Sequence, residues 1–141
     1  MIEELYVIAK KHNVEIHYFE MKEIESLSIP GAIAIDKRKM KNSIDEKEHL
    51  YHEMGHCVTG SFYNIHCKFD LREKKEYKAD KWAIKELLPF PELLRALEQG
   101  ITEVWRLAEH FEVSENLIKK ALRLYEEKLL HAKEKMHCEE F

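Results

Sequence analysis

The chain has 141 residues, enough for one compact domain or one domain with a small appendage, and its 45% hydrophobic and 35% charged residues are typical of a soluble globular protein. The net charge of −4 gives no general attraction to nucleic acid, which argues against a protein that binds DNA or RNA by charge alone. The sequence shows neither a signal peptide nor an apolar stretch of about eighteen residues, so we expect a cytoplasmic protein with no membrane partner.

The first elements of the chain are a predicted helix and two short predicted strands. The helix covers residues 2–12, where Leu5 and Ala9 fall on one side. Residues 14–19 alternate loosely between apolar and polar side chains, and residues 31–36 carry an apolar run between a Pro-Gly pair and a basic turn. We expect the two strands to pair as a small sheet.

The next helix is predicted over residues 43–60 and begins with a clear start signal. The Ser43 side chain can accept a hydrogen bond from a backbone amide of the first turn. The Glu46 side chain can in turn accept one from the backbone amide of Ser43. Apolar residues accompany the helix along its length, which indicates that it is buried. Gly55 lowers the helix propensity, a cost that is tolerable where a backbone or a substrate must come close.

This helix carries the most informative motif of the chain, His-Glu-Met-Gly-His. His52 and His56 lie four residues apart and therefore on one face, so that their Nε2 atoms can reach one Zn²⁺. Glu53 points aside and can act as the general base that takes a proton from water. The alternative is that both histidines are ordinary half-buried side chains.

A zinc site needs a third ligand, for which Glu76 is the candidate. It lies on a helix predicted to begin after Asp70 as N-cap, on a face that is otherwise mostly apolar. A carboxylate on such a face is costly to bury unless a cation meets it. Asp80, one turn later, could accept the Nδ1 proton of a ligand histidine and so fix its tautomer. The alternative is a solvated face of charged pairs.

These two helices resemble the two signatures of the ImmA/IrrE metallopeptidases, small gluzincin-like proteins of phages, mobile elements and bacteria. The family pattern is His-Glu-x-Gly-His followed by Glu-x-x-Ala-Asn/Asp-x-aromatic-Ala-x-x-Leu-Leu-x-Pro. Here Asp80 takes the Asn/Asp position and Trp82 the aromatic one, while Pro89 follows Leu88 directly, without the usual intervening residue. The resemblance covers residues 31–89.

The resemblance implies that His52, His56 and Glu76 bind zinc and that Glu53 is the catalytic base. It further implies a zinc-dependent endopeptidase that cleaves a repressor of the helix-turn-helix type and so relieves repression. Residues 31–36 are similar to the strand that lines the cleft in gluzincin-like proteases, where it pairs with extended substrate. A strand that only covers the helix from outside is the alternative.

Peptide hydrolysis develops negative charge on the carbonyl oxygen, and zinc peptidases usually add a Tyr or His donor that stabilises it. The sequence offers such side chains in and around the segment between the two metal helices. The candidates are Tyr63, His66, Tyr77 and His49.

The C-terminal part of the chain is predicted to be entirely helical. After a short helix over residues 92–98, residues 101–111 and a helix from residue 115 onward have the spacing of a helix-turn-helix. Glu112 occupies the turn position where such motifs usually have Gly, and nearby acidic residues oppose phosphate contacts. DNA binding through Lys119 and Lys120 is therefore possible but not favoured, and structural support is the preferred interpretation.

The overall expectation is an α+β protein. A mostly helical, zincin-like core with a two- or three-stranded sheet is predicted over residues 1–91. A helical region resembling a helix-turn-helix is predicted over residues 92–141, either separate or packed as part of the same domain. The preferred function is a Zn²⁺ endopeptidase acting on a protein substrate. The alternatives are a non-catalytic antirepressor and a DNA-binding regulator with a structural or sensory metal site.

Overall fold

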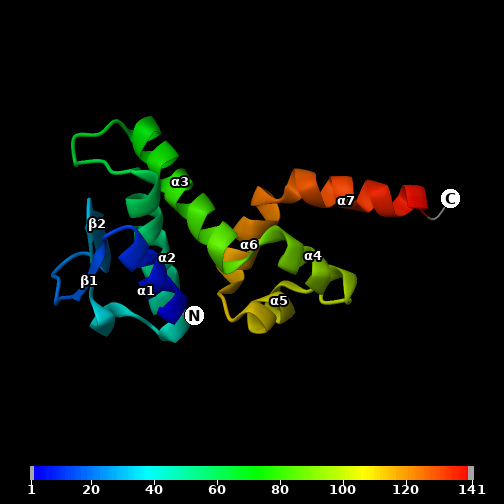
Figure 1. Ribbon diagram of the computed structural model, residues 1–141, viewed down its shortest axis with the longest axis horizontal. Helices are drawn as coiled ribbons and strands as arrows, with labels where there is room; N and C mark the ends of the chain where they lie inside the picture. The colour runs from blue at the N-terminus through cyan, green and yellow to red at the C-terminus, as the bar shows by residue number, and fades with distance from the viewer. Residues whose placement is uncertain (1, 140–141) are drawn as a thin grey trace. The chain divides into compact units, whose positions relative to one another are not determined.

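A computed structural model describes the backbone of residues 2–139 and the side chains of residues 2–135 (Figure 1). Over this range the protein has seven α-helices and a three-stranded mixed sheet, which confirms the predicted α+β class. The elements in chain order are α1 (Ile2–Lys11), β1 (Glu15–Tyr18), β2 (Ser26–Ile29), β3 (Ala32–Ile35), the 3₁₀ helix η1 (Lys37–Lys39), α2 (Ser43–Thr59), α3 (Phe69–Leu87), α4 (Phe90–Glu98), α5 (Val104–Phe111), α6 (Glu115–Leu124) and α7 (Glu126–Glu139).

The chain divides into two compact units, Met1–Ala83 and Ile84–Phe141. The first contains the sheet, the helices α1 and α2 and most of α3, and the second contains the remaining helices. The domain limits predicted from the sequence stay a prediction. No helix in the described part of the chain is long and apolar enough to cross a membrane.

The sheet has the strand order β1-β3-β2, so β3 is its central strand. β1 runs parallel to β3, and β2 runs antiparallel to it, with Ser28 opposite Ile33. The sequence located two of these strands and missed β2, because its sequence Ser-Leu-Ser-Ile contains two serines, a residue type typical of turns and loops.

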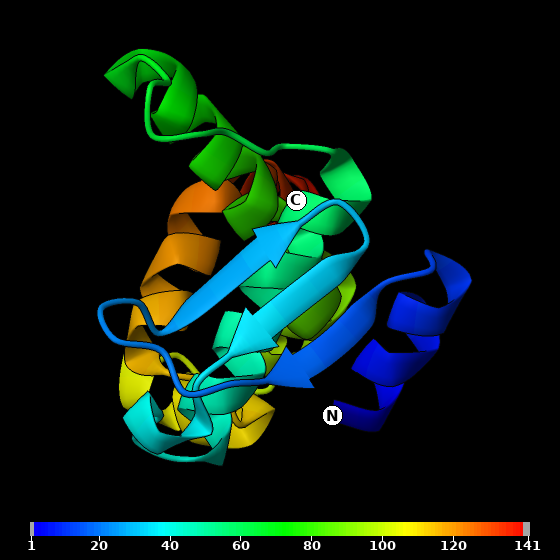
Figure 2. The same ribbon diagram turned by 90° about the vertical axis from the view of Figure 1, so that its left-hand side faces the viewer.

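The first unit is held together by apolar side chains between the sheet and its helices. α2 packs against β2 and β3, and α1 packs against α2 and β1; Figure 2 shows the sheet in front of α2. Ile33 and Ile35 point from β3 into this core, where Leu50 and Met54 of α2 are fully buried. The alternating buried pattern of β3 follows from the period of two residues along a strand.

The start signals of α2 and α3 differ from those predicted. Ser43 is the first residue of α2, and the cap is Asn42, whose side chain accepts a hydrogen bond from the Asp45 amide at 2.8 Å. Asp70 was predicted to cap the next helix but lies inside its first turn, because α3 begins at Phe69. The predicted cap is one residue too late in α2 and two residues too late in α3, and helix ends read from a sequence are commonly uncertain by this much.

The second unit has its own apolar core. Its buried side chains include Leu88, Leu93, Leu107 and Ile118, and the Tyr125 hydroxyl donates to the Leu88 carbonyl at 2.9 Å. α5 and α6 are joined by a turn in which Glu112 adopts a left-handed conformation with φ 55°. The turn that usually requires Gly is therefore formed here by a glutamate.

Candidate metal centre

Three potential metal ligands converge between α2 and α3. The Nε2 atom of His52 lies 2.7 Å from Glu76 Oε2, and the Nε2 atom of His56 lies 3.4 Å from Glu76 Oε1. One nitrogen or oxygen from each of the three residues lies within 4.8 Å of the other two. The two histidines share a face of α2 because they are separated by about one helical turn. The sequence predicted that these three residues form one site, and the structure places their ligand atoms next to one another.

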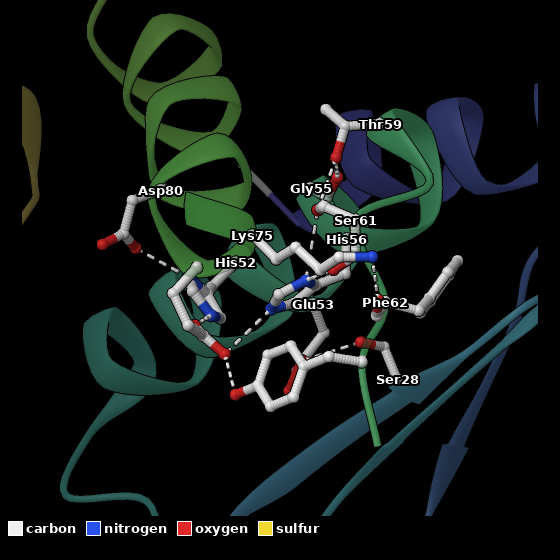
Figure 3. Close-up of polar contacts among 12 residues, drawn as sticks. Ser28, His52, Glu53, Gly55, His56, Thr59, Ser61, Phe62, Lys75 and Asp80 are labelled. Carbon is white, nitrogen blue, oxygen red and sulfur yellow. Dashed lines mark hydrogen bonds and ion pairs between the residues drawn. The ribbon is translucent and has the colours of Figure 1, made fainter. Parts of the chain in front are cut away.

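The other ring nitrogen of each histidine is occupied by a hydrogen bond. His52 Nδ1 lies 2.7 Å from Asp80 Oδ1, and His56 Nδ1 lies 2.6 Å from the carbonyl oxygen of Ser61 (Figure 3). Both oxygen atoms are acceptors, so in the neutral ring each Nδ1 carries the proton and each Nε2 has a lone pair with which it could bind a metal. The position of Asp80 agrees with the role predicted for it, which stays a prediction.

The side chains of His52 and Glu76 shift one another's pKa values. Burial by itself lowers the pKa of His52, but hydrogen bonds with Asp80 and Glu76 outweigh this effect and raise the pKa to about 10. The pKa of Glu76 is lowered well below its usual range by hydrogen bonds from His52 and then His56. Without another cation, the site therefore draws a proton onto His52 to balance its carboxylates.

A divalent metal ion fits this donor set. Two imidazole nitrogens and one carboxylate are the ligands that zinc takes in hydrolytic sites with one open position. The metal would supply the positive charge that His52 otherwise carries, and the hydrogen bonds to Asp80 and Ser61 already orient both rings. The residues present thus fit a metal, while the identity of the metal is a separate question.

Glu53 lies beside the ligands without being one of them. Its side chain is 6% exposed, and its Oε1 atom accepts a hydrogen bond from the Ser28 hydroxyl at 2.9 Å. Glu53 opens onto a cavity of about 440 Å³ together with the three ligands. The residues that line this cavity are Ile24, Ser26, Leu27, Ser28, His49, His52, Glu53, His56, Phe62, Tyr63 and Glu76.

Two of the four candidate oxyanion donors line the cavity, and the other two do not. Tyr63 lines the cavity and donates to Glu76 Oε1 at 2.5 Å, and burial together with this bond raises the pKa of Tyr63 to about 12. His49 also lines the cavity, with its ring nitrogens 2.9 Å from the Asp45 carbonyl and from Glu25. His66 and Tyr77 do not line it. Tyr63 is thus the candidate with a hydroxyl proton beside the ligands.

Three contacts in and around the site could not have been found from the sequence. Ser28 reaches Glu53 from a strand that the sequence did not reveal. Ser61 acts through its backbone carbonyl, which any residue type could provide. Lys75 Nζ, in turn, donates to the Phe62 carbonyl at 2.6 Å and ties the segment after α2 to α3. Each contact joins residues that are distant in the chain or uses backbone atoms, so no sequence pattern marks it.

The strand that borders the cavity is also different from the one expected. Residues 31–36 were predicted to line the cleft and pair with substrate, but β3 already has β1 on one side and β2 on the other. Of the two alternatives given for this segment, pairing with substrate is therefore wrong, because a central strand has no free backbone groups with which to bind a further strand. β2 is an edge strand and supplies Ser26, Leu27 and Ser28 to the cavity wall.

A comparison with protein families decides the classification. The model of the M78 peptidases, described as the IrrE N-terminal-like domain, matches residues 9–123. The chain belongs to the IrrE N-terminal-like family. The resemblance seen in residues 31–89 therefore extends over most of the chain, and the His52, His56 and Glu76 cluster lies within the matched part of this metallopeptidase domain. No curated protein matches the chain.

Proposed function

We propose that the chain is a zinc-dependent endopeptidase that cleaves a repressor of the helix-turn-helix type. The observation that carries the enzymatic part is the convergence of His52, His56 and Glu76 beside the carboxylate of Glu53 in one cavity. Zinc is favoured over other divalent ions because two imidazoles and a carboxylate suit a tetrahedral site with one open position. The choice of substrate rests on the family resemblance.

His52, His56 and Glu76 would hold the metal, which when bound lowers the pKa of water and polarises a carbonyl. Glu53 would accept the proton of the attacking water and pass it to the leaving amine. Tyr63 is protonated at neutral pH and would donate a hydrogen bond to the oxygen on which negative charge develops. Each of these side chains lines the same cavity.

The edge strand β2 offers a way to hold the substrate. Its free side carries backbone donors and acceptors next to the cavity, so an extended peptide segment could pair with it. Ile24, just before the strand, adds apolar surface to the same wall. A substrate segment that is extended, with apolar side chains near the scissile bond, would suit this arrangement.

Metal content is the first test. Wild-type protein and the variants Glu53→Gln, His52→Ala and Glu76→Ala should be purified, checked for folding and analysed for elements. Wild type and Glu53→Gln should each hold about one zinc per chain, whereas the two ligand variants should lose it. A folded wild type that holds no zinc and takes none up would refute the proposal.

A second test addresses cleavage. The chain should be co-expressed with candidate helix-turn-helix repressors, and both repressor fragments and reporter output should be followed. Wild type should produce fragments and relieve repression, and Glu53→Gln should do neither. Full relief of repression by Glu53→Gln would favour the non-catalytic antirepressor instead.

The DNA-binding alternative has a test of its own. Lys119 and Lys120 are exposed on α6, so both can be neutralised with little risk to the fold. If the chain is retained on DNA, the neutralised variant loses this retention and Glu53→Gln keeps it, a regulator would be favoured over an enzyme.

A further inference from the structure

We propose that Ser28 is a positioning residue that holds the Glu53 carboxylate in its working orientation, an inference that rests on the proposed peptidase function. The Ser28 hydroxyl donates to Glu53 Oε1 at 2.9 Å, across a separation of 25 residues in the chain. Figure 3 shows the Ser28 side chain on its strand pointing toward Glu53 on α2. The contact therefore joins the edge strand of the sheet to the predicted base.

Glu53 needs such a partner because its side chain is both buried and long. Its conformation is set by three side-chain torsions, and fixing them costs conformational entropy. The carboxylate is also removed from most of the solvent, where unsatisfied charge is costly. A hydrogen bond from a hydroxyl to a carboxylate is short and directional, so it can fix the orientation of the group.

The hydrogen bond leaves the base free to act. A carboxylate has two oxygen atoms, each of which accepts more than one hydrogen bond. Ser28 occupies one lone pair of Oε1, and the other oxygen atom remains available to accept the proton of water. Ser28 has no contact with the three ligand residues among the described hydrogen bonds, so its effect on catalysis would act through Glu53.

The composition of β2 supports a specific role for this serine. Ser26 and Ser28 lie opposite Ile35 and Ile33 of β3, so each shares a face with a fully buried isoleucine. Leu27 and Ile29 point the other way and are about half exposed. Ser26 and Ser28 both line the cavity, and among the described hydrogen bonds it is the Ser28 hydroxyl that reaches Glu53.

The kinetic test compares Ser28→Ala with Ser28→Thr in the zinc-loaded full chain, with a pool of internally quenched peptides as the substrate. Ser28→Ala should lower kcat by roughly ten-fold or more while KM changes little, as expected for a lost hydrogen bond to a charged group. Ser28→Thr keeps the hydroxyl and should restore kcat. Equal kcat values for Ser28→Ala and wild type would overturn the proposal.

A thermal test needs no substrate and so separates this inference from the proposed function. The shifts in Tm caused by Ser28→Ala and Glu53→Ala should be non-additive when the two changes are combined. Ser26→Ala is the control, because it removes a hydroxyl from the same face of β2 two residues away. Its shift in Tm and that of Glu53→Ala should be additive. Additive shifts for Ser28 as well would overturn the proposal, whereas a wild type that neither binds zinc nor cleaves any peptide would refute the peptidase function.

Discussion

Gly55 lies so close to the backbone of Ala79 that a β-carbon at position 55 would sit 2.5 Å from the Ala79 carbonyl oxygen. Gly55 lies between His52 and His56 on α2, and the fully buried Ala79 lies between Glu76 and Asp80 on α3. The two helices therefore approach one another where the candidate metal ligands face each other. The glycine of the motif is explained by this close approach and not by any turn in the helix.

Gly55→Ala should weaken the metal site. Alanine favours helix by about 1 kcal/mol over glycine, but the new β-carbon would meet backbone atoms that can only yield if α3 moves. We expect a lower Tm and a lower zinc affinity, because Glu76 moves away from His52 and His56. Thermal unfolding and a zinc titration check this, and a variant with wild-type Tm and affinity would contradict it.

Asp80→Asn should lower zinc affinity by about ten-fold or more, since carboxylates that accept the Nδ1 proton raise the basicity of a ligand histidine. The contact concerned is the 2.7 Å hydrogen bond between Asp80 Oδ1 and His52 Nδ1. Competition with a chromophoric chelator measures the affinity. Asp70→Asn, at an exposed position on the same helix, is the matched control, and equal affinities for the two variants would argue against a role for Asp80.

Tyr63→Phe should reduce kcat by about 100-fold if Tyr63 stabilises the developing oxyanion, because removal of one such donor typically has an effect of this size. Zinc content should be kept, since the hydroxyl donates to Glu76 but is not part of the ligand cluster. Tyr77→Phe is the control, as Tyr77 is 57% exposed and does not line the cavity. Similar turnover by both variants would exclude Tyr63 as the donor.

Asp36→Asn should destabilise the protein in a pH-dependent way. Asp36 is 1% exposed and accepts hydrogen bonds from Arg38 and from the Met21 amide, which hold its pKa well below the usual range. Because its pKa is lower in the folded state, the stabilisation is complete above the unfolded pKa of about 4 and is lost as the pH falls through the folded pKa. The Tm gap between wild type and variant should thus be widest near neutral pH and close in strong acid.

Thermal unfolding of both proteins over a series of pH values from neutral to strongly acidic measures this gap. Parallel curves over the whole range would show that the ionised form of Asp36 contributes no stability. The comparison does not depend on the metal, because Asp36 lies at the start of η1 and outside the ligand cluster.

The sequence by itself was enough to locate α2 and α3, apart from their first residues, and to identify the residue types of the candidate metal cluster. His52 and His56 share a face of α2, and Glu76 and Asp80 share a face of α3, because the period of a helix is a local property of the chain. The α+β class follows from the same local patterns. These features required no knowledge of which elements touch.

Tertiary structure decided the features that depend on contacts between distant residues. The central place of β3, the edge position of β2 and the contact between Ser28 and Glu53 arise from strand pairing, which local periodicity does not encode. The tertiary structure also places Tyr63 and His49 in the cavity wall, whereas His66 and Tyr77 do not line it. Residue types show which chemistry is available, but the packing of α2, α3 and the sheet decides which groups meet.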